Sequence, residues 1–177
     1  MGTLTPRVLS SAPKAATGTI HRPRIAVTFA IREQHTLGAR IAGVFFQREG
    51  WDVQIEPDSA ALLRTYTDDA VSPNESDPPL FDVVAVAVCS EDAFDEARAV
   101  ISAIRSAQPR LARRIMVAGR AITLEHGEDE SFLSDIGADF AVADVRFGPW
   151  LAARALRSDA LHPSTGLETG ADDVRPE

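Results

Sequence analysis

Apolar and polar residues follow one another in blocks that predict alternating strands and helices. Short, almost wholly apolar runs are typical of strands that are covered on both faces, and longer stretches show helical spacing. The strands are expected at 24–30, 51–55, 81–89, 115–118 and 140–143, and the helices at 37–49, 60–66, 90–109, within 121–135 and at 150–157. In the first helix, the apolar set Leu37, Ile41, Val44 and Phe45 recurs at this spacing. The alternation predicts an α/β protein: a flavodoxin-like, Rossmann-like, doubly wound five-stranded parallel sheet of order 2-1-3-4-5 with helices on both faces.

The two ends of the chain lack this pattern. Residues 1–23 are rich in Ser, Thr, Ala, Gly and Pro, and residues 158–177 are rich in Pro, Gly, Asp and Glu. Such segments bury little apolar surface, so we expect a flexible leader and a flexible acidic tail around one domain, 24–157.

The charge, the lengths of the apolar runs and the cysteine content exclude several classes of function. The net charge of −8 should repel nucleic acid, and we find no DNA-binding pattern, so we expect no direct contact with nucleic acid. No apolar run approaches the ~20 residues of a membrane span, and the N-terminus lacks the apolar core of a signal peptide. The single cysteine, Cys89, excludes an intrachain disulfide and suits a reducing compartment, so we expect a cytoplasmic protein.

The loop after the first strand carries the strongest chemical signal. It reads Glu33-Gln34-His35-Thr36-Leu37-Gly38 and leads directly into the first helix. Loops that join a strand to a helix at the carboxyl edge of an open sheet are where such folds bind ligands. Histidine is the commonest metal ligand, and Glu33 could hold its second ring nitrogen. His35 is therefore a candidate metal ligand, and a polar loop histidine without a ligand is the alternative.

Three loops should meet at the crevice between the first and third strands: 31–38, 89–93 and 119–123. A dinucleotide site would need G-x-G-x-x-G after the first strand, which is absent. A phospho-acceptor receiver would need an aspartate after the third strand, where Cys89 or Ser90 stands. A hydrolase with Cys89 or Ser90 as nucleophile and His35 as base is conceivable but is the weakest hypothesis.

These loops resemble the cobalamin-binding domain of methionine synthases, corrinoid proteins and mutases. That family carries D-x-H-x-x-G after strand one, S-x-L at strand three and G-G after strand four. The corresponding stretches here are Glu33 to Gly38, Ala87-Val88-Cys89 and Ala118-Gly119, and the turn 136–139 also matches. The resemblance implies cobalamin bound with His35 as lower cobalt ligand and its nucleotide tail in a slot beside the sheet. The implied cofactor-binding residues are Glu33, His35, Gly38, Ala87, Cys89, Ser90, Ala118, Gly119 and Arg120.

Within this family, the stretch from His35 to Val53 resembles the stand-alone photosynthesis-gene antirepressors of purple bacteria and the related haem-binding sensor domain. Ala87 in place of serine removes one hydrogen bond to the tail, and Ala118 in place of glycine adds a methyl group. Haem has no such tail and is therefore the alternative cofactor. His126 or His21 could supply a second axial ligand, although an exposed loop histidine is the commoner situation.

The resemblance implies a non-enzymatic cobalamin-binding sensor that contacts a transcription factor or another regulatory protein. Three alternatives stay open: a haem-binding sensor of the same fold, a cofactor-free interaction module, and a corrinoid carrier for methyl transfer.

Overall fold

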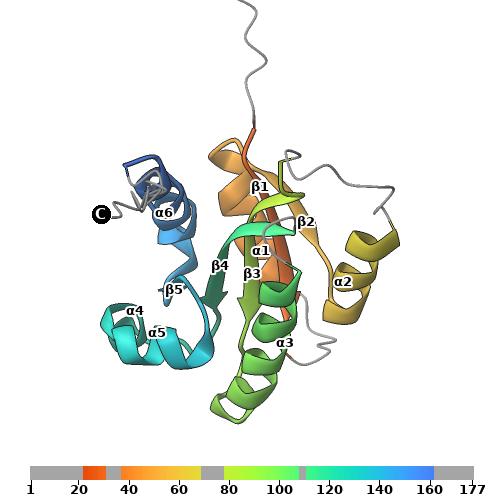
Figure 1. Cartoon of the computed structure of the whole chain (residues 1–177). Coiled ribbons are helices and arrows are strands. Elements are labelled where there is room, and N and C mark those ends of the chain that lie inside the picture. Colours follow the sequence, from red (N-terminus) through yellow and green to blue (C-terminus); the bar gives the residue numbers. More distant parts are fainter. Residues whose placement is uncertain (1–21, 31–36, 69–77, 108–110, 162–177) are drawn as a thin grey trace, which may run out of the picture.

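A computed structural model of the chain describes residues 22–30, 37–68, 78–107 and 111–161. They form one five-stranded parallel sheet of order β2-β1-β3-β4-β5 with helices around it, which confirms the predicted fold (Figure 1). The strands are β1 (Arg24–Phe29), β2 (Asp52–Ile55), β3 (Phe81–Ala87), β4 (Ala112–Ala118) and β5 (Phe140–Val142). The helices are α1 (Leu37–Arg48), α2 (Ser59–Asp68), α3 (Phe94–Ser106), α4 (Leu124–Glu128), α5 (Glu130–Ile136) and α6 (Gly148–Leu161), with 3₁₀ turns η1 (Glu91–Ala93) and η2 (Val145–Phe147). None of the helices in these described ranges is both long and apolar enough to cross a membrane.

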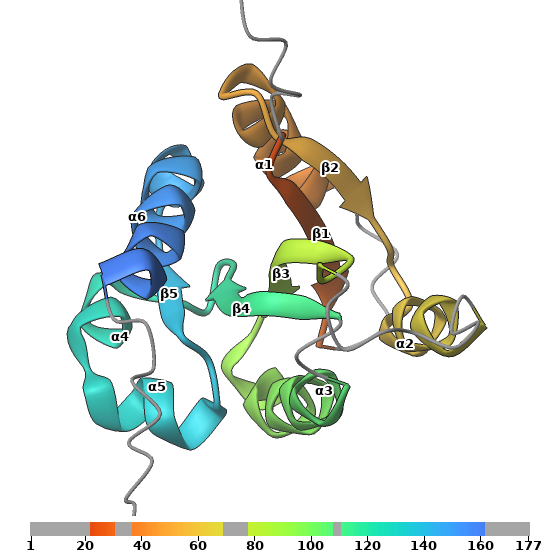
Figure 2. The same cartoon turned by 45° about the horizontal axis from the view of Figure 1, so that its top comes forward.

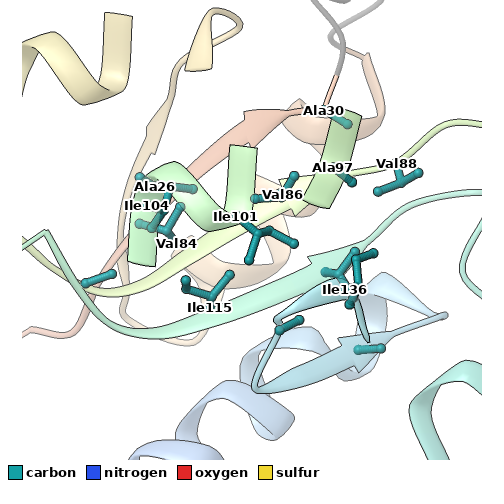
Figure 3. Packing of buried hydrophobic residues seen from close by; sticks show 14 of the residues in the cluster. Ala26, Ala30, Val84, Val86, Val88, Ala97, Ile101, Ile104, Ile115 and Ile136 are labelled. Carbon is teal, nitrogen blue, oxygen red and sulfur yellow. The ribbon is translucent and has the colours of Figure 1, made fainter. Parts of the chain in front are cut away.

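The sheet separates two apolar cores. In Figure 2, α1 and α6 lie on one side of β3 and β4, and α3 lies on the other. The α3 side is tightly filled: Val84, Val86 and Ile115 from the strands pack against Ile101 and Ile104 of α3, and all five are almost inaccessible to solvent (Figure 3). Because successive strand residues point to opposite faces, the intervening positions of the same strands face α1 and α6.

The core beneath α1 and α6 is built differently. Phe46 of α1 is fully buried, and its ring meets that of Trp51 edge to face at 5.2 Å. Toward β3 and β4 this core has small side chains, Ala85 and Ala87, and the flexible Met116. The core beneath α1 and α6 is therefore well packed near β1 and β2 and contains only small or flexible side chains over the middle of the sheet.

Several strand and helix boundaries differ from the predicted ones: β3 ends at Ala87 rather than residue 89, and α3 begins at Phe94 rather than residue 90. β4 starts at Ala112 rather than residue 115, because the polar residues before it are paired: Arg113 approaches Asp82 at 3.5 Å and Arg114 approaches Asp139 at 3.3 Å. The last helix continues to Leu161 instead of ending at residue 157.

Two local predictions also change. Residues 121–135, expected as a loop with one short helix, hold the two helices α4 and α5. Asp129 lies between them and caps α5 by accepting hydrogen bonds from Ser131 N at 2.9 Å and Phe132 N at 3.2 Å. Ser90 occupies the N-cap position before η1, but its side chain makes no capping hydrogen bond.

The apolar stripe of α1 points away from the core. Leu37, Ile41 and Val44 are 69%, 46% and 52% exposed. The buried positions of α1 are instead Ala39, Gly43 and Phe46. Gly43 sits under the β2 side chains, where an added Cβ would meet Val53 at 3.3 Å, so this helix packs closely on the sheet through small residues. The helix is as predicted, but its most apolar side chains remain at the surface.

Candidate functional site

A pocket with a volume of about 840 Å³ lies between the sheet and the helices α1 and α6. Its size is near the upper end of typical small-molecule sites, which span roughly 300–1,000 Å³. The described residues that line it are Val27, Phe29, Gly38, Ala39, Ile41, Ala42, Phe46, Ala85, Ala87, Cys89, Met116, Ala118, Gly119, Arg120, Val142, Ala143, Asp144, Val145 and Gly148. Residues that follow the carboxyl ends of β1, β3, β4 and β5 all contribute, so the pocket combines the crevice of an open α/β sheet with a slot along its face.

The slot is hollow because of an alternation in β3. The chain reads Val84-Ala85-Val86-Ala87-Val88, and the valines fill the α3 side while the alanines face α1 and α6. Ala118 continues this floor on β4, where it is the registered partner of Ala87. Three methyl groups therefore stand where branched side chains would close the space against the helices.

Six of the nine residues predicted to contact a cofactor line this pocket: Gly38, Ala87, Cys89, Ala118, Gly119 and Arg120. Ser90 is exposed and is not among the lining residues. Glu33 and His35 lie outside the described residues, so the predicted metal ligand and its partner stay predictions. The residues on either side of their loop that the structure describes, Phe29 and Gly38, both line the pocket.

Gly119 is required by the backbone itself. Its φ of +126° is a conformation that residues with a side chain rarely adopt, and an added Cβ would lie 2.4 Å from the Val88 carbonyl oxygen. Gly38 differs, because an added Cβ there would meet nothing within 4 Å. The two glycines therefore differ in their role: Gly119 lets the chain after β4 pass close to the Val88 backbone, whereas the position of Gly38 has room for a side chain.

One wall of the pocket comes from the segment between β5 and α6, which sequence reasoning missed. Val142, Asp144, Val145 and Gly148 line this side. A Cβ at Gly148 would touch the Phe46 ring at 3.1 Å, so this glycine allows α6 to approach α1. Gly148, the first residue of α6, is the only signal of this wall in the sequence of the segment, which lacks the motif residues of the other loops.

Among the described residues that line the pocket, Asp144 is the acidic one. Its carboxylate accepts hydrogen bonds from Arg146 Nε at 3.0 and 2.9 Å and from the Arg146 backbone N–H at 3.0 Å. The guanidinium, followed by the backbone N–H, lowers the pKa of Asp144 to about 2. The carboxylate therefore stays ionised at the pocket wall and already has a partner.

We expect a direct NMR titration of the Asp144 carboxyl to show a midpoint near pH 2. Arg146→Gln should move this midpoint up toward 3.8, without reaching it, because the backbone hydrogen bond remains. Since the folded pKa lies below the unfolded one, the pair favours folding above about pH 4, and this contribution is lost as the pH falls toward 2. An unchanged midpoint in Arg146→Gln would show that the guanidinium is not the cause.

His126, considered above as a second axial ligand, is on helix α4 and does not line the pocket. Its Nδ1 accepts a hydrogen bond from Thr123 N at 3.1 Å, and its ring stacks on Phe132 with the centroids 4.2 Å apart. These contacts assign His126 a structural role at the start of α4. His21 and His162 lie outside the described residues.

The polar groups of the pocket are few. Cys89 is half-buried, and its carbonyl oxygen accepts a long hydrogen bond from Arg120 Nε at 3.4 Å. Over the ranges that the structure describes, no cluster of three or more His, Cys, Asp or Glu side chains could hold a metal ion. The described walls thus suit a largely apolar organic ligand with polar groups at its ends.

Comparison with known proteins agrees at the level of the fold. No protein-family model and no curated protein matches the sequence. Among solved structures, a cobalamin-binding protein from Desulfitobacterium hafniense DCB-2 is 16% identical with a TM-score of 0.55, over 76% of this chain and 59% of that one. The monomethylamine corrinoid protein of Methanosarcina barkeri is 12% identical with a TM-score of 0.54, over 74% of this chain and 57% of that one.

A receiver domain protein (CheY-like) of Methanospirillum hungatei JF-1 is also similar: it is 14% identical with a TM-score of 0.52, over 81% of this chain and all of that one. The chain thus spans less than two thirds of the two corrinoid-related proteins and the full length of the receiver. At these identities the similarity concerns the fold alone. The chain has the flavodoxin-like fold that cobalamin-binding domains and receiver domains share.

Proposed function

We propose that the protein binds cobalamin, with the nucleotide tail in the pocket between the sheet and the helices α1 and α6. The single observation that carries this proposal is the hollow floor of Ala85, Ala87 and Ala118 beneath those helices. A tightly packed sheet of this fold has no space for a bulky tail, whereas here the space is about 840 Å³ and opens at the carboxyl edge. His35 is the proposed lower cobalt ligand, and Glu33 is its proposed hydrogen-bond acceptor.

The lining fits the parts of such a ligand. Val27, Phe29 and Met116 offer apolar surface to an aromatic base, and Gly119 exposes backbone that a tail can approach closely. Arg120 is exposed at the rim, where its charge suits a phosphate or an amide side chain. Bound cobalamin would supply a cobalt ion with an exchangeable upper ligand, which gives a sensor a chemical change to report.

Haem is the weaker cofactor hypothesis and a phospho-acceptor role is weaker still. A flat macrocycle without a tail leaves a deep slot unused, and the slot is the main feature of this site. A receiver needs an aspartate at the end of β3, and the chain has Cys89 and Ser90 there.

We further propose a regulatory role without catalysis, through contact with a transcription factor or another regulatory protein. The net charge of −8 disfavours direct contact with DNA, and the pocket lining holds no paired acid and base among the described residues. A chemical change at the bound cofactor would then alter how a partner protein binds at the surface.

The proposal is tested by incubating the purified protein with hydroxocobalamin or with haemin, removing free pigment on a desalting column and recording the visible spectrum. We expect about one equivalent of cobalamin to be retained. His35→Ala should shift the absorption bands and weaken retention, since the lower ligand is lost while the tail pocket remains. His126→Ala is the matched control, because that histidine contacts Phe132 outside the pocket, and it should behave as the wild type.

Three results would count against the proposal. Loss of cobalamin equally in both histidine variants would show that His35 has no special role. Retention of haemin but not of cobalamin would favour the haem sensor. Retention of neither pigment would leave a cofactor-free interaction module.

A further inference from the structure

Two exposed apolar stripes border the pocket on opposite sides. On α1 the stripe is Leu37, Ile41 and Val44, with exposures of 69%, 46% and 52%. On η2 and α6 it is Phe147 and Trp150, with exposures of 58% and 57%. A single large apolar side chain with this exposure is common, but five of them on the neighbouring elements α1, η2 and α6 mark an interaction surface. We call this the α1/α6 face.

Both stripes continue into arginines at the same spacing. Along α1, positions 37, 41 and 44 lead one turn further to Arg48, and from η2 into α6 positions 147 and 150 lead to Arg154 and Arg157. Residues three and four apart lie on one side of a helix, so each stripe is apolar at its N-terminal end and basic at its C-terminal end. Arg154 lies over the Trp150 ring, 5.7 Å from its centroid, which joins the two parts of the α6 stripe.

The two helices run on the same side of the sheet. α1 contacts both α6 and η2, and both helices lie on the side of β3 and β4 opposite α3 in Figure 2. The pocket lies between the elements that carry the two stripes, since Ile41 of α1, Val145 of η2 and Gly148 of α6 all line it. Val44, Phe147 and Trp150 do not line the pocket, whereas Ile41 does, so the surface adjoins the ligand site through Ile41.

The charge of this face is opposite to that of the protein. Helix α1 contains Arg40 and Arg48 and no carboxylate, and α6 contains one, Asp159, near its end. Within the described ranges, no ion pair involves Arg40, Arg48 or Arg157. The other side of the sheet is acidic: η1 and the first turn of α3 alone carry Glu91, Asp92, Asp95 and Glu96. A basic and apolar surface on a chain of net charge −8 needs a specific reason.

We propose that the α1/α6 face binds an acidic amphipathic helix of a protein partner. This inference rests on the proposed regulatory function, and it specifies the chemical character of the partner's binding segment. An apolar stripe on such a helix would cover Val44 and Trp150, and its flanking carboxylates would meet the arginines at the C-terminal ends of α1 and α6. A symmetric dimer through this face would offer these arginines almost no carboxylates, since α1 contains none and α6 contains only Asp159, and the net charge of −8 disfavours nucleic acid and anionic lipid.

The test uses a fluorescein-labelled synthetic helix of about 18 residues, five turns long, with one leucine stripe flanked by glutamates. Its anisotropy is measured against the full chain, and a second peptide with lysine in place of every glutamate serves as the charge control. We expect the acidic peptide alone to bind. Trp150→Ser and Val44→Ser should each weaken binding tenfold or more, since exposed anchors of this kind dominate interfaces. Leu124→Ser on α4, an equally apolar change at a 76% exposed site outside the α1/α6 face, should leave binding unchanged.

The proposal is overturned if the acidic peptide does not bind, if the lysine peptide binds as well, or if Leu124→Ser weakens binding as much as Trp150→Ser. Two other results would assign the α1/α6 face to a different occupant. Dimerisation in sedimentation velocity that is lost in Trp150→Ser would indicate a second copy of the chain, and binding to phosphatidylserine vesicles that is lost in the same variant would indicate a lipid surface. Cobalamin retention is recorded on the same variants and should stay normal. Peptide binding without cobalamin retention would refute the proposed cofactor alone, and retention without peptide binding would refute the docking surface alone.

Discussion

Gly119→Ala should destabilise the protein by about 3 kcal/mol, one of the larger effects available to a single methyl group. The added Cβ would lie 2.4 Å from the Val88 carbonyl oxygen and 2.9 Å from the Val88 nitrogen, and the residue would keep a φ of +126°. Val88 cannot move aside, because its N–H donates to the Ala118 carbonyl at 2.8 Å and its carbonyl accepts from Ala121 N at 3.2 Å. The strain therefore falls on the ladder between β3 and β4.

Thermal unfolding followed by circular dichroism measures this loss, which should appear as a fall in Tm of roughly 10 °C for a chain of this size. Gly38→Ala is the matched control. Its Cβ meets nothing within 4 Å and it lies in a helix, so this variant should be as stable as the wild type or more stable by about 0.5 kcal/mol. Equal stability of the two alanine variants would contradict the assigned role of Gly119.

The strands and helices could be predicted because the apolar patterns that determine them are local in the sequence. The apolar runs at β1, β3 and β5 and the helical spacing of Ala97, Ile101 and Ile104 in α3 each bury the residues that the pattern indicates. Right-handed crossovers then leave few arrangements of a parallel sheet. The start of β4 could not be predicted in this way, because Arg113 and Arg114 are tolerated in the strand only through distant partners, Asp82 and Asp139.

The orientation of α1 shows where periodicity fails. A pattern identifies an apolar stripe but not what the stripe contacts, and here Leu37 and Val44 are exposed while Ala39 and Gly43 are buried. The small residues face the sheet because α1 packs closely there, as the 3.3 Å approach at Gly43 indicates. The stripe was correctly recognised, but the buried side of the helix can be known only from the packing.

The part of the candidate site that is formed by loops after strand ends could be predicted, whereas the slot along the face of the sheet could not. The loops after β1, β3 and β4 were located from the topology, and Cys89, Gly119 and Arg120 do line one pocket. The slot depends on the combined absence of bulk at Ala87 and Ala118, which are ordinary strand residues in a sequence. The alternation of alanine and valine in β3 was the available signal, since it predicts one full and one hollow face.

Ala87→Phe should lower the affinity for cobalamin by a factor of at least one hundred, which corresponds to about 3 kcal/mol. Ala87 lies on the pocket floor opposite Ala118 and beside Phe29, its registered partners on β4 and β1. A benzyl group at this position would occupy the slot that the nucleotide tail needs. Because it would fill existing space rather than displace packed atoms, the unliganded protein should keep its Tm or gain in stability.

Titration with hydroxocobalamin followed by absorbance measures the affinity, and thermal unfolding without the pigment measures the stability. Val86→Phe is the matched control, because Val86 is the neighbouring residue, is fully buried and faces the filled core against α3. Overpacking that core should cost about 1–3 kcal/mol of stability without entering the slot. Ala87→Phe should therefore lower the affinity for cobalamin without loss of stability, whereas Val86→Phe should lower the stability without loss of affinity. Equal cobalamin affinity in Ala87→Phe and the wild type would show that the tail does not occupy the slot.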